Sequence, residues 1–186
     1  HLDDIADSRP ARVHLVPGRP TVGDVVIKVV FDKPARDVDG DQVSYRYRWS
    51  VDGREVNLLS SASSFPAGLA RKGEKVSVKV TSHDGEDSGA SSVAEVTVVN
   101  TPPGQPRLEL VPARPVTGDR LLVRLLAAAE DVDGDSLVYR TTWRVDGKRP
   151  SGKGVSAFSV APAATARGQK WAVTVVASAG QAEGRP

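Results

Sequence analysis

Short runs in which apolar and polar residues alternate recur along the chain and predict β-strands. Residues 45–51 read YRYRWSV, with the aromatic residues and Val on one face and the polar residues on the other. Residues 76–80 and 171–175 alternate in the same way, and residues 25–31 and 93–99 are rich in β-branched side chains. Asp-Gly, Pro and Ser clusters separate these runs, a rhythm typical of an all-β sandwich.

The same pattern occurs twice. The segment DVDGD at residues 37–41 returns at residues 131–135, a spacing of 94 residues, whereas the spacing ahead of it is 95. Matched positions include Tyr45 and Tyr139, Trp49 and Trp143, and Gly23 and Gly118. The repeat predicts two tandem all-β sandwich domains, residues 9–102 and 103–186, each long enough to bury its own core.

The repeat also settles ambiguous segments. Residues 125–130 and 161–166 are rich in Ala, but they match residues 29–36 and 66–71, so we expect a strand end and a loop. The linker at residues 100–106 reads NTPPGQP, and so short a Pro-rich link favours domains arranged end to end.

The second copy is shorter than the first at its end. The first copy continues with a strand pattern through residues 91–100, whereas the second stops at Pro186, so we expect the second sandwich to lack its last strand. Such a sandwich has an unpaired apolar edge along residues 171–177. Either a longer chain runs on to supply the strand, or a partner chain supplies it by β-addition.

Composition narrows the class of protein. There is no Cys, so no disulfide forms, and no apolar run approaches the roughly 20 residues that span a bilayer. The formal charge is only +2, a weak signal for nucleic acid. Charge is −2 through Pro103 and +4 from Gly104 on, which is either ordinary surface variation or a basic docking face. We expect no nucleic-acid partner and no membrane insertion.

The order of motifs resembles a known group of proteins. It runs from TVGD at residues 21–24 through DVDGD and YRYRW to Asp84-Gly85 and VVNTPP at residues 98–103. This resembles the bacterial cadherin-like and PKD-like immunoglobulin-type repeats of secreted and surface proteins. The resemblance implies that both domains are immunoglobulin-like β-sandwiches. It also implies an exported protein, secreted, on the cell surface or in the periplasm, whose partners are neighbouring domains of a longer chain. The linker departs from true cadherins, because it has a single Asn and no flanking acids.

Three carboxylates in five residues are the strongest candidate for chemistry. Asp-x-Asp-x-Asp offers oxygen ligands that can converge on one hard cation, and calcium takes about 6–8 oxygens. The spacing is not that of an EF-hand, because Arg48 and Thr142 stand where Glu is required. The alternative is an acidic turn without metal, since Asp-Gly favours tight turns and Asp caps backbone amides.

The loop between the second and third strands of such a sandwich lies where the chain enters the domain. We therefore expect a calcium ion at the junction of the domains, bound mainly by Asp131 and Asp133 with help from Asn100 and Asp24, which stiffens the junction. The full set of candidate metal ligands is Asp37, Asp39, Asp41, Asn100, Asp131, Asp133 and Asp135.

The remaining candidates favour a protein without catalysis. Trp49 and Trp143 lie among the inward residues and are expected in the core; a carbohydrate-stacking role requires them exposed. The opposite face is either solvated or a docking surface, and it carries Arg46, Arg48, Arg140 and Arg144. No nucleophile is spaced to join the three histidines. We expect a structural or adhesion module outside the cytoplasm, with a glycan- or protein-docking module, or an accessory domain of a secreted enzyme, as alternatives.

Overall fold

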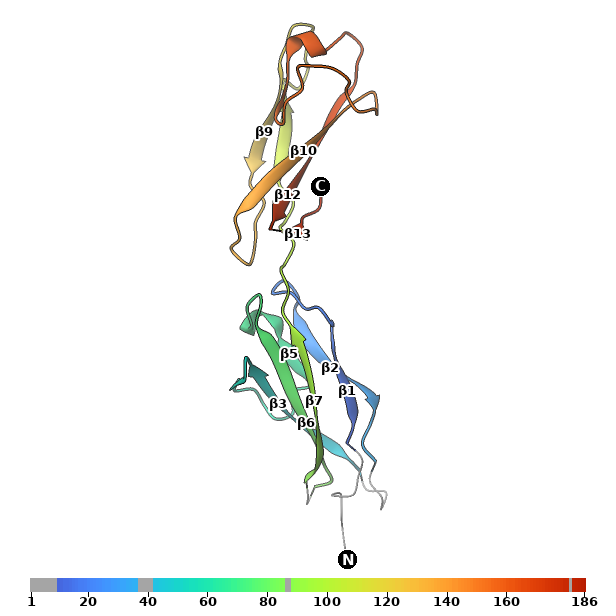
Figure 1. Ribbon diagram of the computed structural model, residues 1–186, viewed down its shortest axis with the longest axis vertical. Helices are drawn as coiled ribbons and strands as arrows, with labels where there is room; N and C mark the ends of the chain where they lie inside the picture. The colour runs from blue at the N-terminus through green and yellow to red at the C-terminus, as the bar shows by residue number, and fades with distance from the viewer. Residues whose placement is uncertain (1–9, 37–41, 86–87, 181) are drawn as a thin grey trace, which may run out of the picture. The chain divides into compact units, whose positions relative to one another are not determined.

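The computed structural model of the chain describes residues 10–36, 42–85, 88–180 and 182–186. It divides into two compact units, His1–Thr101 and Pro102–Pro186. Both are built almost entirely from β-strands, as Figure 1 shows. Among the described residues, no helix has the length and apolar character needed to cross a membrane.

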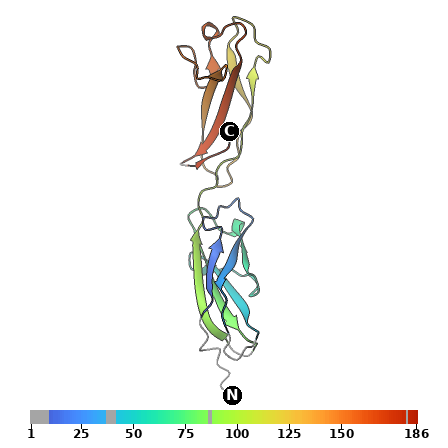
Figure 2. The same ribbon diagram turned by 90° about the vertical axis from the view of Figure 1, so that its right-hand side faces the viewer.

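The first unit is a two-layered sandwich. Its strands are β1 (Arg12–Val16), β2 (Val26–Lys33), β3 (Ser44–Val51), β4 (Arg54–Glu55), β5 (Ser64–Pro66), β6 (Lys75–His83) and β7 (Ser88–Thr97). One sheet has the order β1-β2-β5 and the other β4-β3-β6-β7, and every pair of neighbouring strands is antiparallel. A short 3-10 turn, η2 (Ala67–Leu69), follows β5. In Figure 1, β1 and β2 lie to the right of β3 and β6, and in Figure 2, which is viewed from that side, β1 and β2 are in front.

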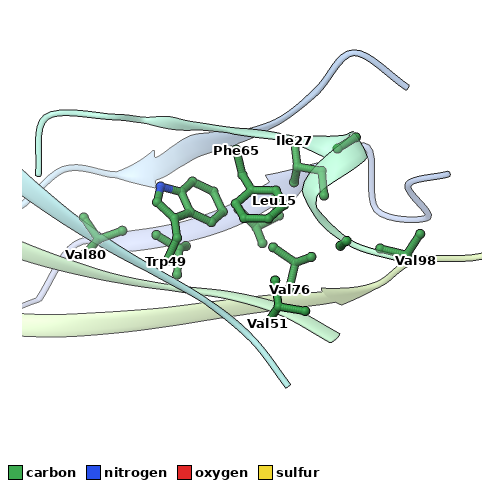
Figure 3. Packing of buried hydrophobic residues seen from close by; sticks show 11 residues of the cluster. Leu15, Ile27, Trp49, Val51, Phe65, Val76, Val80 and Val98 are labelled. Carbon is green, nitrogen blue, oxygen red and sulfur yellow. The ribbon is translucent and has the colours of Figure 1, made fainter. Parts of the chain in front are cut away.

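The core of the first unit lies between these sheets. Trp49 is 1% exposed, and its ring centroid lies 5.4 Å from that of Phe65. Figure 3 shows the two side chains next to each other in the core. The indole Nε1 donates a hydrogen bond of 2.8 Å to the carbonyl of Ala62, so the polar atom of this buried side chain is satisfied. Val76 and Val78 are fully buried beside it. The strict alternation along β3 and β6 produces this arrangement, because every second side chain points inward.

The second unit repeats this arrangement with two three-stranded sheets. Its strands are β8 (Arg107–Val111), β9 (Leu121–Ala127), β10 (Leu137–Val145), β11 (Ser159–Val160), β12 (Trp171–Ala179) and β13 (Ala182–Glu183). The sheets have the orders β11-β9-β8 and β10-β12-β13. Trp143 lies opposite Val173 as Trp49 lies opposite Val78, so the central pair of strands keeps one register in both units. A buried cluster of Leu121, Trp143 and Val160 forms the core.

The strands expected at residues 25–31, 45–51, 76–80, 93–99 and 171–175 are confirmed, each end to within five residues. The Ala-rich stretches are the end of β9 and a loop with one 3-10 turn, η3 (Pro162–Ala164), as expected. The pattern did not reveal β1 or β8. Both end immediately before the cis peptide bonds Val16–Pro17 and Val111–Pro112.

The last strand is the main difference between the units. β7 has ten residues, whereas β13 at the same place has two and pairs only with Ser178 and Ala179. Within the described residues, the edge of β12 from Trp171 to Val176 has no neighbouring strand on that side.

Candidate metal site

A tyrosine anchors the acidic loop between β9 and β10. The backbone N–H of Ala129, just before the loop, donates a 3.0 Å hydrogen bond to the hydroxyl oxygen of Tyr139 on β10. The first unit has the same bond, 2.8 Å long, from Ala35 to Tyr45. Both alanines are buried. The start of the loop is therefore fixed to the third strand in each copy of the repeat.

Asp131 organises the loop around its own carboxylate. Its Oδ1 atom accepts hydrogen bonds of 3.0 Å from the backbone N–H groups of both Asp133 and Asp135. The N–H of Gly134 donates to the Asp131 carbonyl at 3.2 Å, and Gly134 has a φ of 76°, which glycine adopts without strain. These hydrogen bonds to Oδ1 are those of a turn-forming Asp side chain, the expected alternative to a metal ligand.

The turn does not account for the other carboxylate oxygens. One oxygen from each of Asp131, Asp133 and Asp135 lies within 4.8 Å of the other two, and all three residues are half-buried. The second oxygen of Asp131, Oδ2, is buried and has no hydrogen-bond partner among the residues that the structure describes. Two unit charges at this separation repel by about 1 kcal/mol in water and about 3 kcal/mol at an effective dielectric constant of about 20. A divalent cation between the three oxygens would attract all of them, and the net electrostatic energy of the cluster would become favourable.

The loop also contacts the segment that leads into the second unit. The N–H of Gly104 donates a 2.8 Å hydrogen bond to the carbonyl of Glu130, the residue directly before Asp131. A Cβ atom at position 104 would stand 3.4 Å from that same carbonyl oxygen, so the two backbones lie close together. An ion bound by Asp131 would thus be held by the residue next to Glu130, which is bonded to Gly104 in the leading segment.

The other predicted ligands have different surroundings. Asn100 belongs to the first unit, where its Oδ1 accepts a 2.9 Å hydrogen bond from Nζ of Lys72. Asp24 caps a turn, because its Oδ2 accepts from the backbone N–H of Thr21 at 2.7 Å. Asp37, Asp39 and Asp41 lie outside the described residues. The structure thus brings together Asp131, Asp133 and Asp135, and the predicted junction ion stays a prediction.

Sequence reasoning missed the residues that position this loop. The sequence pattern gives Tyr139 only as the repeat match of Tyr45, and it does not single out Gly104 or Glu130 as part of a site. One signal was present: Ala35 and Tyr45 recur together as Ala129 and Tyr139 in both copies of the repeat. Nothing in the spacing identified the backbone contact of Gly104, because it joins two loops.

Comparisons with known proteins concern the fold. No known protein family matches the chain, and no curated protein does. Among solved structures, the chain is similar to a segment of two fibronectin type III domains from chicken tenascin, with 12% identity, a TM-score of 0.44, and coverage of 96% of this chain and 95% of that one. It is also similar to the FN1–FN3 domains of chicken CNTN1, with 12% identity, a TM-score of 0.38, and coverage of 95% and 61%.

The basic face expected on β3 is exposed in the first unit. Arg46, Arg48 and Lys79 line one shallow groove together with the hydroxyl-bearing residues Ser60, Thr81 and Ser88 and with Tyr47. Burial raises the pKa of the Tyr47 phenol, with a smaller contribution from Tyr45, so Tyr47 is neutral at pH 7.

This face is partly neutralised in both units, since Arg48 of the first unit forms a 3.4 Å ion pair with Glu55. Arg140 forms a 2.7 Å ion pair with Glu183 of β13, and Arg144 donates to the Gly147 carbonyl. The burial expected for Trp49 and Trp143 is confirmed, at 1% and 5% exposed. A sugar therefore cannot stack on either ring.

Proposed function

We propose that the protein is a non-catalytic structural module of an exported protein, and that Asp131, Asp133 and Asp135 of its second unit bind a calcium ion. The cluster of three carboxylate oxygens within 4.8 Å carries this proposal. The buried Oδ2 of Asp131 has no hydrogen-bond partner in the described part of the chain. It supports the proposal because such an atom is costly unless a cation or donor satisfies it.

The donor set suits calcium better than transition metals. All three side chains offer carboxylate oxygen, which is the ligand of hard cations, and no Cys is present. Three carboxylates leave room for backbone carbonyls and water in the 6–8 positions that calcium fills. We expect a dissociation constant of about 0.1 to 1 mM, the range of extracellular calcium modules.

In this proposal the bound ion makes part of the chain more rigid. It cancels the repulsion inside the loop and orders Glu130, which in turn holds Gly104 by its hydrogen bond. The segment leading into the second unit becomes more rigid when calcium is bound. A module of this kind serves as a spacer or adhesive element between neighbouring domains of a longer chain.

Isothermal titration of the metal-stripped protein with calcium tests the proposal. The variant Asp133→Asn/Asp135→Asn removes two charges but keeps the Asp131 side chain that forms the turn. We expect it to lose one saturable binding event, or to bind at least about 10-fold more weakly. The matched control is Asp146→Asn, whose carboxylate caps a turn in the same unit. An unchanged isotherm for the double variant, or no heat at millimolar calcium, rejects the site.

A second candidate function rests on the groove of Arg46, Arg48 and Lys79. Arg48 is paired with Glu55, but the three cations beside several hydroxyl groups still leave the groove positively charged. Such a groove suits an anionic polymer, such as a carboxylated or sulfated glycan. Heparin binding that falls steeply with salt, and that Arg46→Gln/Arg48→Gln abolishes, would favour this docking role. The matched control is Arg140→Gln/Arg144→Gln on the same face of the second unit.

A further inference from the structure

The outer edge of β10 lies on the opposite side of its sheet from β13. Among the described residues, β12 is the only strand that neighbours β10, because the sheet order is β10-β12-β13. The two strands pair without interruption from Leu137, opposite Ala179, to Val145, opposite Trp171. A long, regular and uncovered edge presents a row of backbone N–H and carbonyl groups to which another strand can pair.

The first unit shows how the chain can close this edge by itself. β3 is the equivalent of β10, and β4 and the residues after it run along its outer side. The N–H of Tyr47 donates a 2.7 Å hydrogen bond to the carbonyl of Ser60, and the carbonyl of Trp49 accepts one of 2.9 Å from the N–H of Val56. Val56 and Leu58 also pack against the core, so this segment is fixed by both its backbone and its side chains.

Thr141 and Trp143 take the places of Tyr47 and Trp49 in the register of the two sheets. The N–H of Thr141 and the carbonyl of Trp143 therefore also point away from the neighbouring strand. In the part of the chain that the structure describes, no backbone group bonds to either of them, and on this side only the end of the hairpin at Val145 is paired.

Pro150 prevents the chain from closing the edge of β10 as it closes that of β3. Counted from the shared Asp-Gly turn, Pro150 stands at the place of Val56. Proline has no N–H, so it cannot donate to the carbonyl of Trp143 as Val56 donates to that of Trp49. The open edge is therefore encoded in the sequence.

The segment after Pro150 folds onto the other sheet instead. It reads SGKG at residues 151–154 and contains no large apolar side chain that could pack on the core as Leu58 does. The carbonyl of Gly154 accepts a 2.7 Å hydrogen bond from the N–H of Ala161, directly after β11. This path leads the chain away from the backbone of β10.

Basic residues surround the open edge. Arg144 of β10 is exposed, as are the basic residues that follow it, Lys148, Arg149 and Lys153. Arg149 stands where the first unit has Glu55, the ion-pair partner of Arg48. From residue 137 to residue 153 the only acid is Asp146, whose carboxylate caps the hairpin turn. The charge along this edge favours an acidic partner.

We propose that the outer edge of β10 binds an extended acidic segment of another protein, which joins the sheet as an antiparallel strand. Its backbone pairs with the groups of Thr141 and Trp143 that point outward, and its acidic side chains lie on the face that carries Arg144. A second copy of this chain fits less well, because two β10 edges would bring the arginines of both copies onto one face. This inference does not depend on calcium.

A synthetic peptide of about eight residues, with Val and Glu alternating, tests the proposal. It is titrated in EDTA at low salt, and the amide signals of the protein are followed by NMR. We expect saturable shifts centred on Thr141 and Trp143. A residue opposite Thr141 has its side chain on the inner face and its N–H toward β10. Methylating the Val nitrogens should therefore weaken binding at least about 10-fold, whereas methylating the Glu nitrogens should change it by less than about 3-fold.

Variants of the protein separate backbone pairing from charge. Thr141→Pro removes the outward N–H and leaves the bonds to β12 in place, so it should weaken binding at least about 10-fold. Lys148→Gln/Arg149→Gln changes only exposed side chains and should weaken binding about 3- to 10-fold, with a smaller effect at high salt. The matched control is Arg114→Gln/Arg120→Gln, which removes the same charge from another exposed part of the second unit and should bind as the parent does.

Four results would overturn the proposal. These are no saturable shift at about 1 mM peptide, equal weakening by the two methylated peptides, equal weakening by the charge variant and its control, and shifts centred on the first unit. The second and third would mean that charge alone attracts the peptide. Shifts of the Thr141 and Trp143 amides that grow with protein concentration in the absence of peptide would assign the edge to a second copy of the chain.

Discussion

The two units share their local geometry but differ in how completely they close. The turn after the third strand is the same in both: Asp52 and Asp146 have φ values of 47° and 48°, and each carboxylate accepts from a lysine N–H at 2.8 Å. The burial of the core is not the same, because only the first unit has a full last strand. Turns and strand register are thus encoded locally. Full burial of the core depends on the last strand in the sequence of each unit.

The two cores also place their large residues on different strands. In the first unit Trp49 packs on Phe65, and Val76 fills the remaining space. In the second unit Val160 stands at the place of Phe65, and Trp171 stands at the place of Val76. Trp143 therefore contacts a tryptophan from its neighbouring strand, with ring centroids 6.2 Å apart and nearly perpendicular planes. A similar volume is supplied from a different strand.

Removing the central tryptophan should give the largest difference in stability loss between the two units. We expect Trp49→Ala to destabilise the first unit by about 3 to 5 kcal/mol, because its ring is enclosed on all sides. Trp143→Ala should cost the second unit roughly 2 kcal/mol, since water already reaches its neighbours. Urea unfolding followed by NMR signals of each unit measures both values. Equal losses would contradict the view that the second core is open.

Exchanging the large residues of the second core tests the compensation between its strands. Val160→Phe adds volume beside Trp171 and Trp171→Val removes it, so each change alone should cost about 1 to 3 kcal/mol. The double variant rebuilds the arrangement of the first unit, and we expect it to recover at least about 1 kcal/mol of the summed loss. The same unfolding experiment gives the coupling energy. Strict additivity would show that the two positions do not share one space.

Deleting the tyrosine hydroxyl tests the anchor that both units share. Tyr45→Phe and Tyr139→Phe each remove the acceptor of a buried backbone N–H, and each should cost about 1 to 2 kcal/mol in its own unit. Tyr139→Phe should in addition weaken the calcium binding of the Asp131 loop, whereas Tyr45→Phe should leave it unchanged. Calcium titration of the two variants checks this difference. If both variants changed the calcium affinity of the Asp131 loop equally, the Tyr139 hydrogen bond would not be what positions that loop.

The smallest effect is expected at the shared turn. Asn tolerates a positive φ and keeps one acceptor oxygen, so Asp52→Asn and Asp146→Asn should each cost about 0.5 kcal/mol or less. The two values should agree within error, because the two turns have the same geometry. A clear difference between the units in thermal unfolding would mean that the turns are not equivalent.

The sequence predicted the parts of the fold that alternation and repetition encode. Period-two runs identified β3, β6 and β12, and the repeat placed Trp49 and Trp143 in the cores. β1 and β8 were missed because they are short strands at sheet edges, with only five residues each in which to establish a pattern.

The candidate site was predictable only in part. DVDGD identified three carboxylates in one loop, because three like charges in five residues need a compensating cause. It could not distinguish the oxygen of Asp131 that forms the turn from the one that lies buried without a partner. That distinction depends on how the backbone folds around the side chain, and the contact of Gly104 with Glu130 depends on where two loops meet.

A calcium titration followed by amide NMR tests the central claim most directly. The metal-stripped protein is titrated to several millimolar calcium, and the signals of Asp133, Asp135 and Gly104 are compared with those of the shared turns at Asp52 and Asp146. The account predicts that the first three shift together along one saturating curve while the turns stay in place. Calcium shifts scattered over exposed acids, or no shift at Asp133 and Asp135, would contradict it.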